Sequence, residues 1–274
     1  MNLAKKRVNG VIYYIIVLLI TTIFIGPILW MIVMSFHPEA GIFTAIAAFR
    51  PTLRNYIEIF KRILFLKSFL NSVFISLVAS SIAVILSLPL SYILARFKFR
   101  RRADLGLWFL SGRIIPPIAV IIPFLLLFNK IKLIDNQLAL ILVYLIPTIA
   151  FSVLIMLPFI RNIPESIEEA AMVDGCTRFS IMMRIIIPLS RHGIIVAFIF
   201  SLITCWNEFF FAFVLTRQNV RTLPVLIQSF LTYSNVKWGE MMATSTMVVI
   251  PLVIFVFLIQ DYLVTGLTLG AVDK

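Results

Sequence analysis

Long runs of apolar residues alternate along the chain with short polar segments. A run of about 20 residues, at ~1.5 Å of rise per residue, is long enough to cross the hydrocarbon core of a membrane as a helix. Six runs reach this length: 11–34, 68–95, 105–129, 137–160, 193–216 and 241–260. They lack the strict alternation of apolar and polar residues that a transmembrane barrel needs. The pattern predicts an all-α membrane protein with six transmembrane helices in a single domain, residues 1–274.

The composition agrees with this fold class and gives an orientation. The chain is 61% hydrophobic and 13% charged, with 24 Lys and Arg against 12 Asp and Glu. Basic residues gather before the first run (5–7) and between the second and third (96–102). Such segments favour the cytoplasmic side, so both termini and the loop 161–192 are predicted to be cytoplasmic. The basic residues in 35–67 oppose this orientation, but longer loops cross regardless of charge. A lipid membrane explains the net charge of +12 without a nucleic-acid partner.

The loop 161–192 carries the chain's most distinctive polar pattern. Pro164 suits a helix start, and acidic residues follow in the first turns, where the helix dipole favours anions. Gly175 suits the left-handed turn that ends such a helix. Ile167, Ala170 and Ala171 form a small apolar face at helical spacing. A second helix, which carries arginines and isoleucines, then runs to Pro188. The pattern alone is typical of a solvated loop or of a short amphipathic helix that docks on a partner.

These residues resemble a known family motif. Glu169-Ala170-Ala171, Asp174-Gly175, Ile185 and Pro188 match the "EAA…G…I-LP" loop of binding-protein-dependent ABC importer permeases. Further similar stretches are "NSVFISL" (71–77), "RIIPP" (113–117), "WNEFFFAFVLT" (206–216), "TLPV" (222–225) and "GLTLGAV" (266–272). Together they resemble the carbohydrate branch, the maltose-type second permease subunit, from about residue 65 onward. Two departures are Cys176, in place of the usual alanine, and His192, where the family often has proline.

The resemblance implies a type I importer bundle in a prokaryotic inner or plasma membrane, with a cytoplasmic coupling helix. That helix would dock on a separate ATPase subunit. The residues implied in ATPase coupling are Glu168, Glu169, Ala170, Ala171, Asp174, Gly175 and Pro188. The implied partners are a homologous permease subunit, two ATPase subunits and an extracytoplasmic sugar-binding protein. ATP and Mg would bind the ATPase, and this chain would bind no cofactor and form half of the translocation pathway.

Two ionisable residues, Arg113 and Glu208, fall inside predicted spans, where such groups usually face a bundle interior or a wet cavity. Trp206 and Asn207 precede Glu208, and an aromatic ring with amide and carboxylate groups is typical of sugar binding. These residues are therefore candidates for the translocation path. The alternative is a structural pair of Arg113 with a carboxylate. The prolines at 89, 116, 117, 123, 147, 158 and 251 are typical of membrane-helix kinks, or of hinges in a pore.

Other function classes lack their sequence signatures. The chain has no phosphate loop of the form GxxxxGK[ST], no HExxH and no GxSxG. Cys176, Cys205, His37 and His192 are not spaced as metal ligands. We therefore expect no catalytic or metal site, and a transport subunit for a sugar or polyol rather than an enzyme. An ion-gradient-driven secondary transporter is the alternative, although it would predict internal repeats that the sequence does not display.

Overall fold

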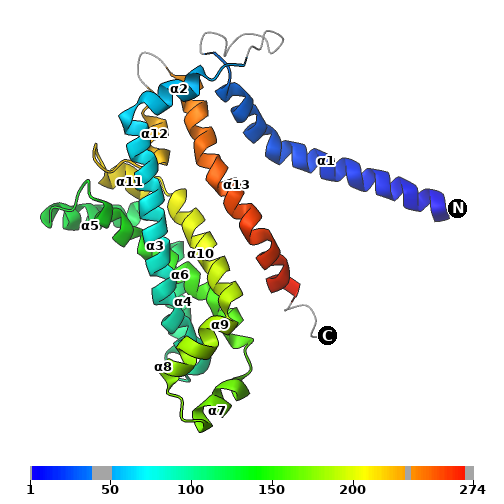
Figure 1. Ribbon diagram of the computed structural model, residues 1–274, viewed down its shortest axis with the longest axis vertical. Helices are drawn as coiled ribbons and strands as arrows, with labels where there is room; N and C mark the ends of the chain where they lie inside the picture. The colour runs from blue at the N-terminus through cyan, green and yellow to red at the C-terminus, as the bar shows by residue number, and fades with distance from the viewer. Residues whose placement is uncertain (1, 39–50, 232–235, 269–274) are drawn as a thin grey trace. The chain divides into compact units, whose positions relative to one another are not determined.

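The structure is a computed structural model that describes residues 2–38, 51–231 and 236–268. Within these ranges every regular element is a helix, apart from a single antiparallel bridge between Leu231 and Val236. The longer helices are α1 (Asn2–Ser35), α3 (Ile63–Arg96), α6 (Gln137–Arg161), α10 (Arg191–Trp206) and α13 (Trp238–Thr268) (Figure 1). The shorter ones are α2 (Arg54–Lys61), α4 (Arg102–Ile114), α5 (Pro117–Lys130), α7 (Glu165–Val173), α8 (Arg178–Ile181), α9 (Ile187–Leu189), α11 (Phe210–Leu215) and α12 (Leu223–Gln228). The all-α prediction is confirmed.

Four of the six predicted runs lie in single long helices. Among the described residues, four helices are long and apolar enough to cross a membrane: α1, α3, α6 and α13. A fifth span results if residues 178–189 and 191–206 are counted together, although they meet at a bend of 77°. The prediction of six transmembrane helices is therefore not confirmed in its count.

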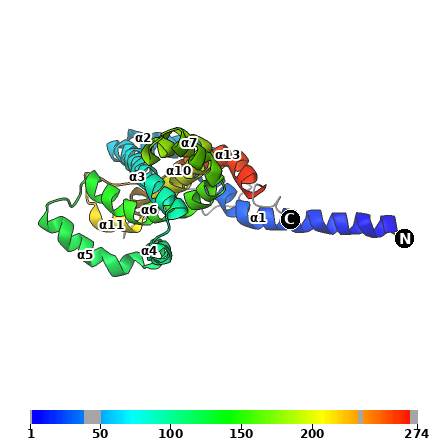
Figure 2. The same cartoon turned by 90° about the horizontal axis from the view of Figure 1, so that it is seen from below.

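The run 105–129 does not form one helix, and this part of the prediction is wrong. Helix α4 ends at Ile114 and α5 begins at Pro117, and Ile115 and Pro116 between them have extended backbones (ψ of 119° and 132°). Figure 2 shows α4 and α5 as two helices in succession. Proline lacks an N–H, and it disfavours helical angles in the residue before it. The pair Pro116-Pro117 therefore interrupts a segment whose hydropathy is continuous.

The chain divides into two compact units. Unit 1 contains residues 1–65 and 227–250, and unit 2 contains residues 66–226 and 251–274. In unit 1, the Asn55 amide of α2 donates to the carbonyl oxygens of Ser35 (2.8 Å) and His37 (2.9 Å). Arg62 and Glu240 form an ion pair with an N–O distance of 2.6 Å. These contacts join α2 to the end of α1 and to the start of α13.

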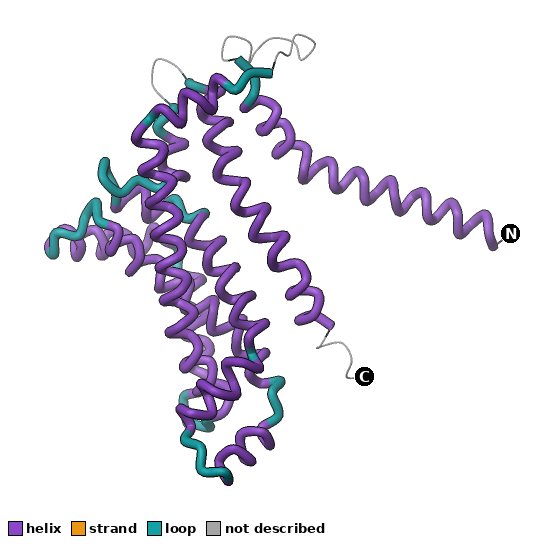
Figure 3. Tube along the Cα trace, in the orientation of Figure 1, coloured by secondary structure: helices purple, strands orange, loops and turns teal. Residues whose placement is uncertain are grey.

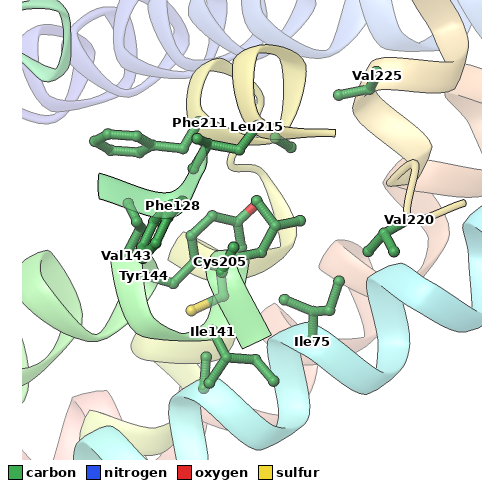
Figure 4. Close-up of a cluster of buried hydrophobic side chains, with 14 of the residues drawn as sticks. Ile75, Phe128, Ile141, Val143, Tyr144, Cys205, Phe211, Leu215, Val220 and Val225 are labelled. Atoms are coloured by element: carbon green, nitrogen blue, oxygen red, sulfur yellow. The ribbon is translucent and has the colours of Figure 1, made fainter. Parts of the chain in front are cut away.

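In unit 2, α6 packs against both α4 and α10. Figure 4 shows part of the main buried cluster, which gathers apolar side chains such as Ile75, Tyr144, Cys205 and Phe211 from different helices. Small hydroxyl side chains lie where helices meet closely. The Ser152 and Ser201 hydroxyls, for example, are buried and hydrogen-bonded to each other across α6 and α10 at 2.8 Å. Small residues let membrane helices approach and add polar contacts between them.

Candidate functional site

The predicted short helix in the loop after α6 is present as α7. It begins at Glu165, directly after Pro164, and ends at Val173. Gly175 follows with a φ of +83°, the left-handed conformation expected of the residue that turns the chain. A β-carbon at Gly175 would meet nothing within 4 Å, so backbone conformation rather than space selects glycine here. Figure 3 shows α7 as a helical segment with loops on both sides.

Glu168 is turned into the protein rather than toward a partner. Its side chain is 2% exposed and forms an ion pair with the Arg96 guanidinium, at the end of α3. The Tyr92 hydroxyl donates to the Glu168 carboxylate at 2.8 Å. Arg96 also donates to the backbone oxygen of Ile163, just before α7, at 2.6 Å. Glu168 therefore fixes α7 to the end of α3, and any role in coupling is positional.

The apolar face predicted for α7 is only partly correct. Ala171 is buried, in a cluster with Ile160 and Ile181, but Ile167 and Ala170 are exposed. The inward face of α7 consists of Glu168 and Ala171, three residues apart. The inward face therefore differs from the predicted one. Arg96 and Tyr92 explain the difference, because they pair with the buried Glu168 carboxylate, and the local sequence pattern gives no sign of these partners. From the sequence alone, Arg96 is only one of several basic residues in the segment 96–102.

The outward side of α7 forms a surface that we call the docking surface: Glu169, Ala170, Val173, Asp174 and, from α8, Phe179. All five are exposed, and the apolar Val173 and Phe179 are exposed by 88% and 69%. An exposed apolar pair with carboxylates beside it is typical of a protein contact. Three of the seven residues predicted for ATPase coupling, Glu169, Ala170 and Asp174, lie on this surface. Of the other four, Glu168 and Ala171 face inward, Gly175 forms the turn, and Pro188 lies further on in α9.

The chain continues from this turn toward the next span through an irregular helix. Residues Met182–Ile186 form a π-helical turn, in which the N–H of Ile187 donates to the oxygen of Met182. Pro188 follows in α9, and the axis bends by 77° before α10. Arg178 of α8 lies over the ring of Phe97, 5.5 Å from its centroid. Figure 1 shows α7 and α8 together at one end of unit 2. Both α7 and α8 are thus attached to the end of α3 or the residues just after it.

The residues predicted for the translocation path lie at a break between α10 and α11. Trp206 is 3% exposed and packs edge-on against Phe69, whereas the Asn207 side chain is exposed. The Glu208 carboxylate accepts from the backbone N–H groups of Phe211 (3.1 Å) and Ala212 (3.2 Å), at the start of α11. Arg113 lies in α4, but its side chain is outside the described part of the structure. Its predicted pairing with a carboxylate stays a prediction.

A second polar cluster, missed from the sequence, lies in the connection after α11. Asp135 has a left-handed backbone (φ 61°), and its carboxylate accepts the backbone N–H groups of residues 217, 218, 219 and 220 at 2.9–3.3 Å. Asn71 donates to the oxygens of Asn219 (3.3 Å) and Arg221 (3.2 Å). Burial raises the pKa of Asp135, but the backbone N–H donors outweigh it and leave the pKa below its ordinary value. The two side chains fix residues 217–221 against α3 and the α5–α6 turn.

Known proteins resemble this chain over most of its length. Residues 87–268 match the family described as the binding-protein-dependent transport system inner membrane component. The Escherichia coli K12 inner membrane ABC transporter permease protein YcjP is 30% identical, with 98% of each chain covered. The trehalose/maltose transport system permease protein MalG of Thermococcus litoralis is 31% identical, with 93% of each covered. The diacetylchitobiose uptake system permease protein DasC of Streptomyces coelicolor is 32% identical, with 91% of this chain covered.

A solved structure has the same fold. It is a bacterial ABC transporter involved in the import of the acidic polysaccharide alginate, with a TM-score of 0.80 and 24% identity, covering 94% of this chain and 97% of that one. The chain belongs to the family of binding-protein-dependent inner membrane transport components. It is a multi-pass permease subunit of an ATP-driven ABC importer, not an enzyme. The ion-gradient-driven alternative is rejected.

Proposed function

We propose that this permease subunit serves the import of a sugar or related polyol and forms half of the pathway. The names of two relatives support the substrate class, since one is a trehalose/maltose transport system and the other is a diacetylchitobiose uptake system. The complex would contain a homologous permease subunit, two ATPase subunits and an external sugar-binding protein. ATP and Mg would bind the ATPase subunits, and both termini and α7 would be cytoplasmic.

The observation that carries the coupling role is the attachment of α7 to α3. A surface that moves with a partner can drive a membrane helix only if the contact between them is stiff. Glu168, Arg96 and Tyr92 form a buried, charged and hydrogen-bonded contact of this kind. The docking surface lies on the other side of the same short helix. We infer that it contacts the ATPase, and that α7 transmits the movement of the ATPase to α3.

We further propose that the break between α10 and α11 lines the pathway. Asn207 is exposed there, and Glu208 lies beside it with its carboxylate only partly enclosed. A helix break leaves backbone N–H and C=O groups without helical hydrogen-bond partners. At membrane depth such groups are tolerated where they line a water-filled cavity. Trp206 is buried, so we assign it a packing role rather than direct contact with a sugar.

Reconstitution tests the proposal. The complete complex in proteoliposomes, with the external binding protein, should take up radiolabelled trehalose, maltose or diacetylchitobiose only when ATP is enclosed with the ATPase. Mass spectrometry of the ligand released from the binding protein purified from cells would identify the natural substrate. Release of an amino acid or peptide, with no uptake of any sugar or polyol, would contradict the substrate class. ATP-dependent uptake that persists after removal of the docking surface would contradict the coupling role.

A further inference from the structure

The ends of three helices in unit 2 surround a basic cavity that the transport function does not explain. Helix α3 ends at Arg96, α4 begins at Arg102 and α6 ends at Arg161. The cavity between them has a volume of about 430 Å³. Arg100, Arg102 and Arg161 contribute the polar part of its lining, and Leu94, Phe99 and Leu157 contribute an apolar part. It therefore combines three positive charges with an apolar wall.

The three guanidinium groups have no carboxylate partner within the described residues. Within the part of the chain that the structure describes, Arg102 donates to the backbone oxygen of Ala95, at 3.3 Å. Arg96, nearby, differs because Glu168 neutralises it. Asp104, in the first turn of α4, is exposed and does not line the cavity. Three like charges around one cavity repel each other, and an anion placed between them would remove this repulsion. Arginine suits phosphate in particular, because its planar group can donate two parallel hydrogen bonds.

The place of the cavity favours a lipid as the source of the phosphate. Helices α3 and α6 are both long and apolar enough to cross the membrane, and the cavity lies where both end. Leu94 of α3 and Leu157 of α6 belong to one apolar cluster on the membrane side of the arginines. Basic pockets at the ends of membrane helices commonly hold lipid head groups. A soluble anion would gain nothing from the apolar wall, whereas the glycerol and first methylenes of a phospholipid would pack on it.

We propose that this cavity binds the head group of an anionic phospholipid, with its phosphate between Arg100, Arg102 and Arg161. This inference does not rest on which substrate the importer carries.

Native mass spectrometry of the full-length chain, purified in detergent with the subunits that accompany it, tests the proposal. Dioleoyl phosphatidylglycerol should be retained at least about fivefold more than dioleoyl phosphatidylcholine, because each basic side chain near the head group adds to the binding free energy of an anionic lipid. The double variant Arg100→Gln/Arg161→Gln should reduce phosphatidylglycerol retention by about tenfold or more. The matched control is Lys98→Gln/Arg101→Gln, which also removes two positive charges, both from the α3–α4 connection, but from residues that do not line the cavity.

A second variant tests the cavity itself without a change of charge. Gly106 lines the cavity, and a β-carbon there would meet nothing within 4 Å. Gly106→Phe should therefore fold normally, occupy the cavity and reduce phosphatidylglycerol retention severalfold. This variant decides the question if the arginine double variant fails to purify.

Three results would overturn the proposal. Equal retention of phosphatidylglycerol and phosphatidylcholine would show that charge plays no part. Equal losses in the control and in the cavity variants, or no loss in Gly106→Phe, would indicate a diffuse surface attraction. Displacement of phosphatidylglycerol by inorganic phosphate at ~10 mM, where the Debye length still exceeds about 10 Å and general screening is weak, would identify a soluble anion as the ligand.

Discussion

Glu168 of α7 and Arg96 of α3 form an ion pair in which both side chains are at least 95% buried, with exposures of 2% and 5%. A buried pair of this kind adds little net stability over an apolar contact. Replacing one of its two residues is costly, however, because the other charge is then buried without a partner. The pair also has a definite geometry, because Tyr92 and the oxygen of Ile163 complete its hydrogen bonds. It therefore determines where α7 is held and which of its faces is exposed.

The first prediction concerns this pair. Arg96→Ala should destabilise the α7 region by about 3–5 kcal/mol, because it leaves the Glu168 carboxylate buried without a countercharge. Thermal unfolding of the purified complex and protease sensitivity of residues 165–180 would measure the loss. Glu165→Gln is the matched control: Glu165 lies 4.0 Å from Arg96 but is 69% exposed, so its loss should have an effect below about 1 kcal/mol. Equal effects of the two variants would show that burial of the pair is unimportant.

The second prediction concerns the turn after α7. Gly175→Leu should weaken ATPase association and uptake, because a left-handed backbone costs a branched residue about 1–2 kcal/mol. Gly175→Asn should retain most activity, since asparagine tolerates these angles. Co-purification of the ATPase and ATP-dependent uptake are the measurements. Since there is open space around a β-carbon here, a loss in both variants would indicate a direct contact with the partner rather than a backbone requirement.

The third prediction concerns the docking surface. Glu169→Lys reverses a charge on an exposed position and should repel a basic groove, whereas Glu169→Gln should have a smaller effect. Both variants should insert in the membrane at normal levels, because Glu169 makes no contact in the core. Loss of substrate-stimulated ATP hydrolysis in Glu169→Lys, with normal chain levels, is the expected result. Unchanged hydrolysis and uptake would remove Glu169 from the coupling surface.

The fourth prediction concerns pH and the Asp135 cluster. The folded pKa of Asp135 lies below its ordinary value of 3.8. The stabilisation of residues 217–220 is therefore fully present above pH 3.8 and is lost as the pH falls through the folded pKa. Hydrogen exchange of a peptide covering these residues, corrected for intrinsic rates, should show protection above the ordinary pKa of 3.8 that is lost as the pH falls through the lower folded pKa.

Asp135→Asn should raise exchange of the same peptide at neutral pH, because a neutral amide oxygen accepts the backbone N–H groups less strongly than a carboxylate does. Asp104→Asn is a suitable control, since Asp104 is an exposed carboxylate in another element. Protection that persists at neutral pH in Asp135→Asn would show that Asn71 alone holds the connection.

The fifth prediction concerns Glu208. Glu208→Ala leaves the N–H groups of Phe211 and Ala212 without their acceptor, so it should cost about 1–3 kcal/mol and lower the yield of the complex. Glu208→Gln keeps one acceptor oxygen and should assemble, but it should transport more slowly if the carboxylate also lines the pathway. Assembly by size-exclusion chromatography and uptake rates would separate the two effects. Normal uptake by an assembled Glu208→Gln complex would leave Glu208 with a structural role alone.

The sequence by itself determined the features that depend on neighbouring residues. Continuous apolar runs specify helices that need a membrane, and a proline followed eleven residues later by a glycine bounds α7, because each residue restricts its own backbone. The family motif around Glu169 and Gly175 is also local, so it was recognisable without a fold. One local signal was misjudged: Pro116-Pro117 splits α4 from α5, and the hydropathy of the run concealed it.

Only the tertiary structure decided which of two adjacent glutamates is buried. Glu168 and Glu169 have the same chemistry and the same local environment, but Arg96 and Tyr92, more than 70 residues away in the chain, pair with Glu168 and not with Glu169. Asp135 likewise holds a segment 82–85 residues further on. Contacts of this kind depend on which helix ends meet in space. A hydrophobic pattern indicates which face of a helix is apolar. It does not indicate that a charged residue far away in the chain can pair with a polar residue of that helix and so allow it to be buried.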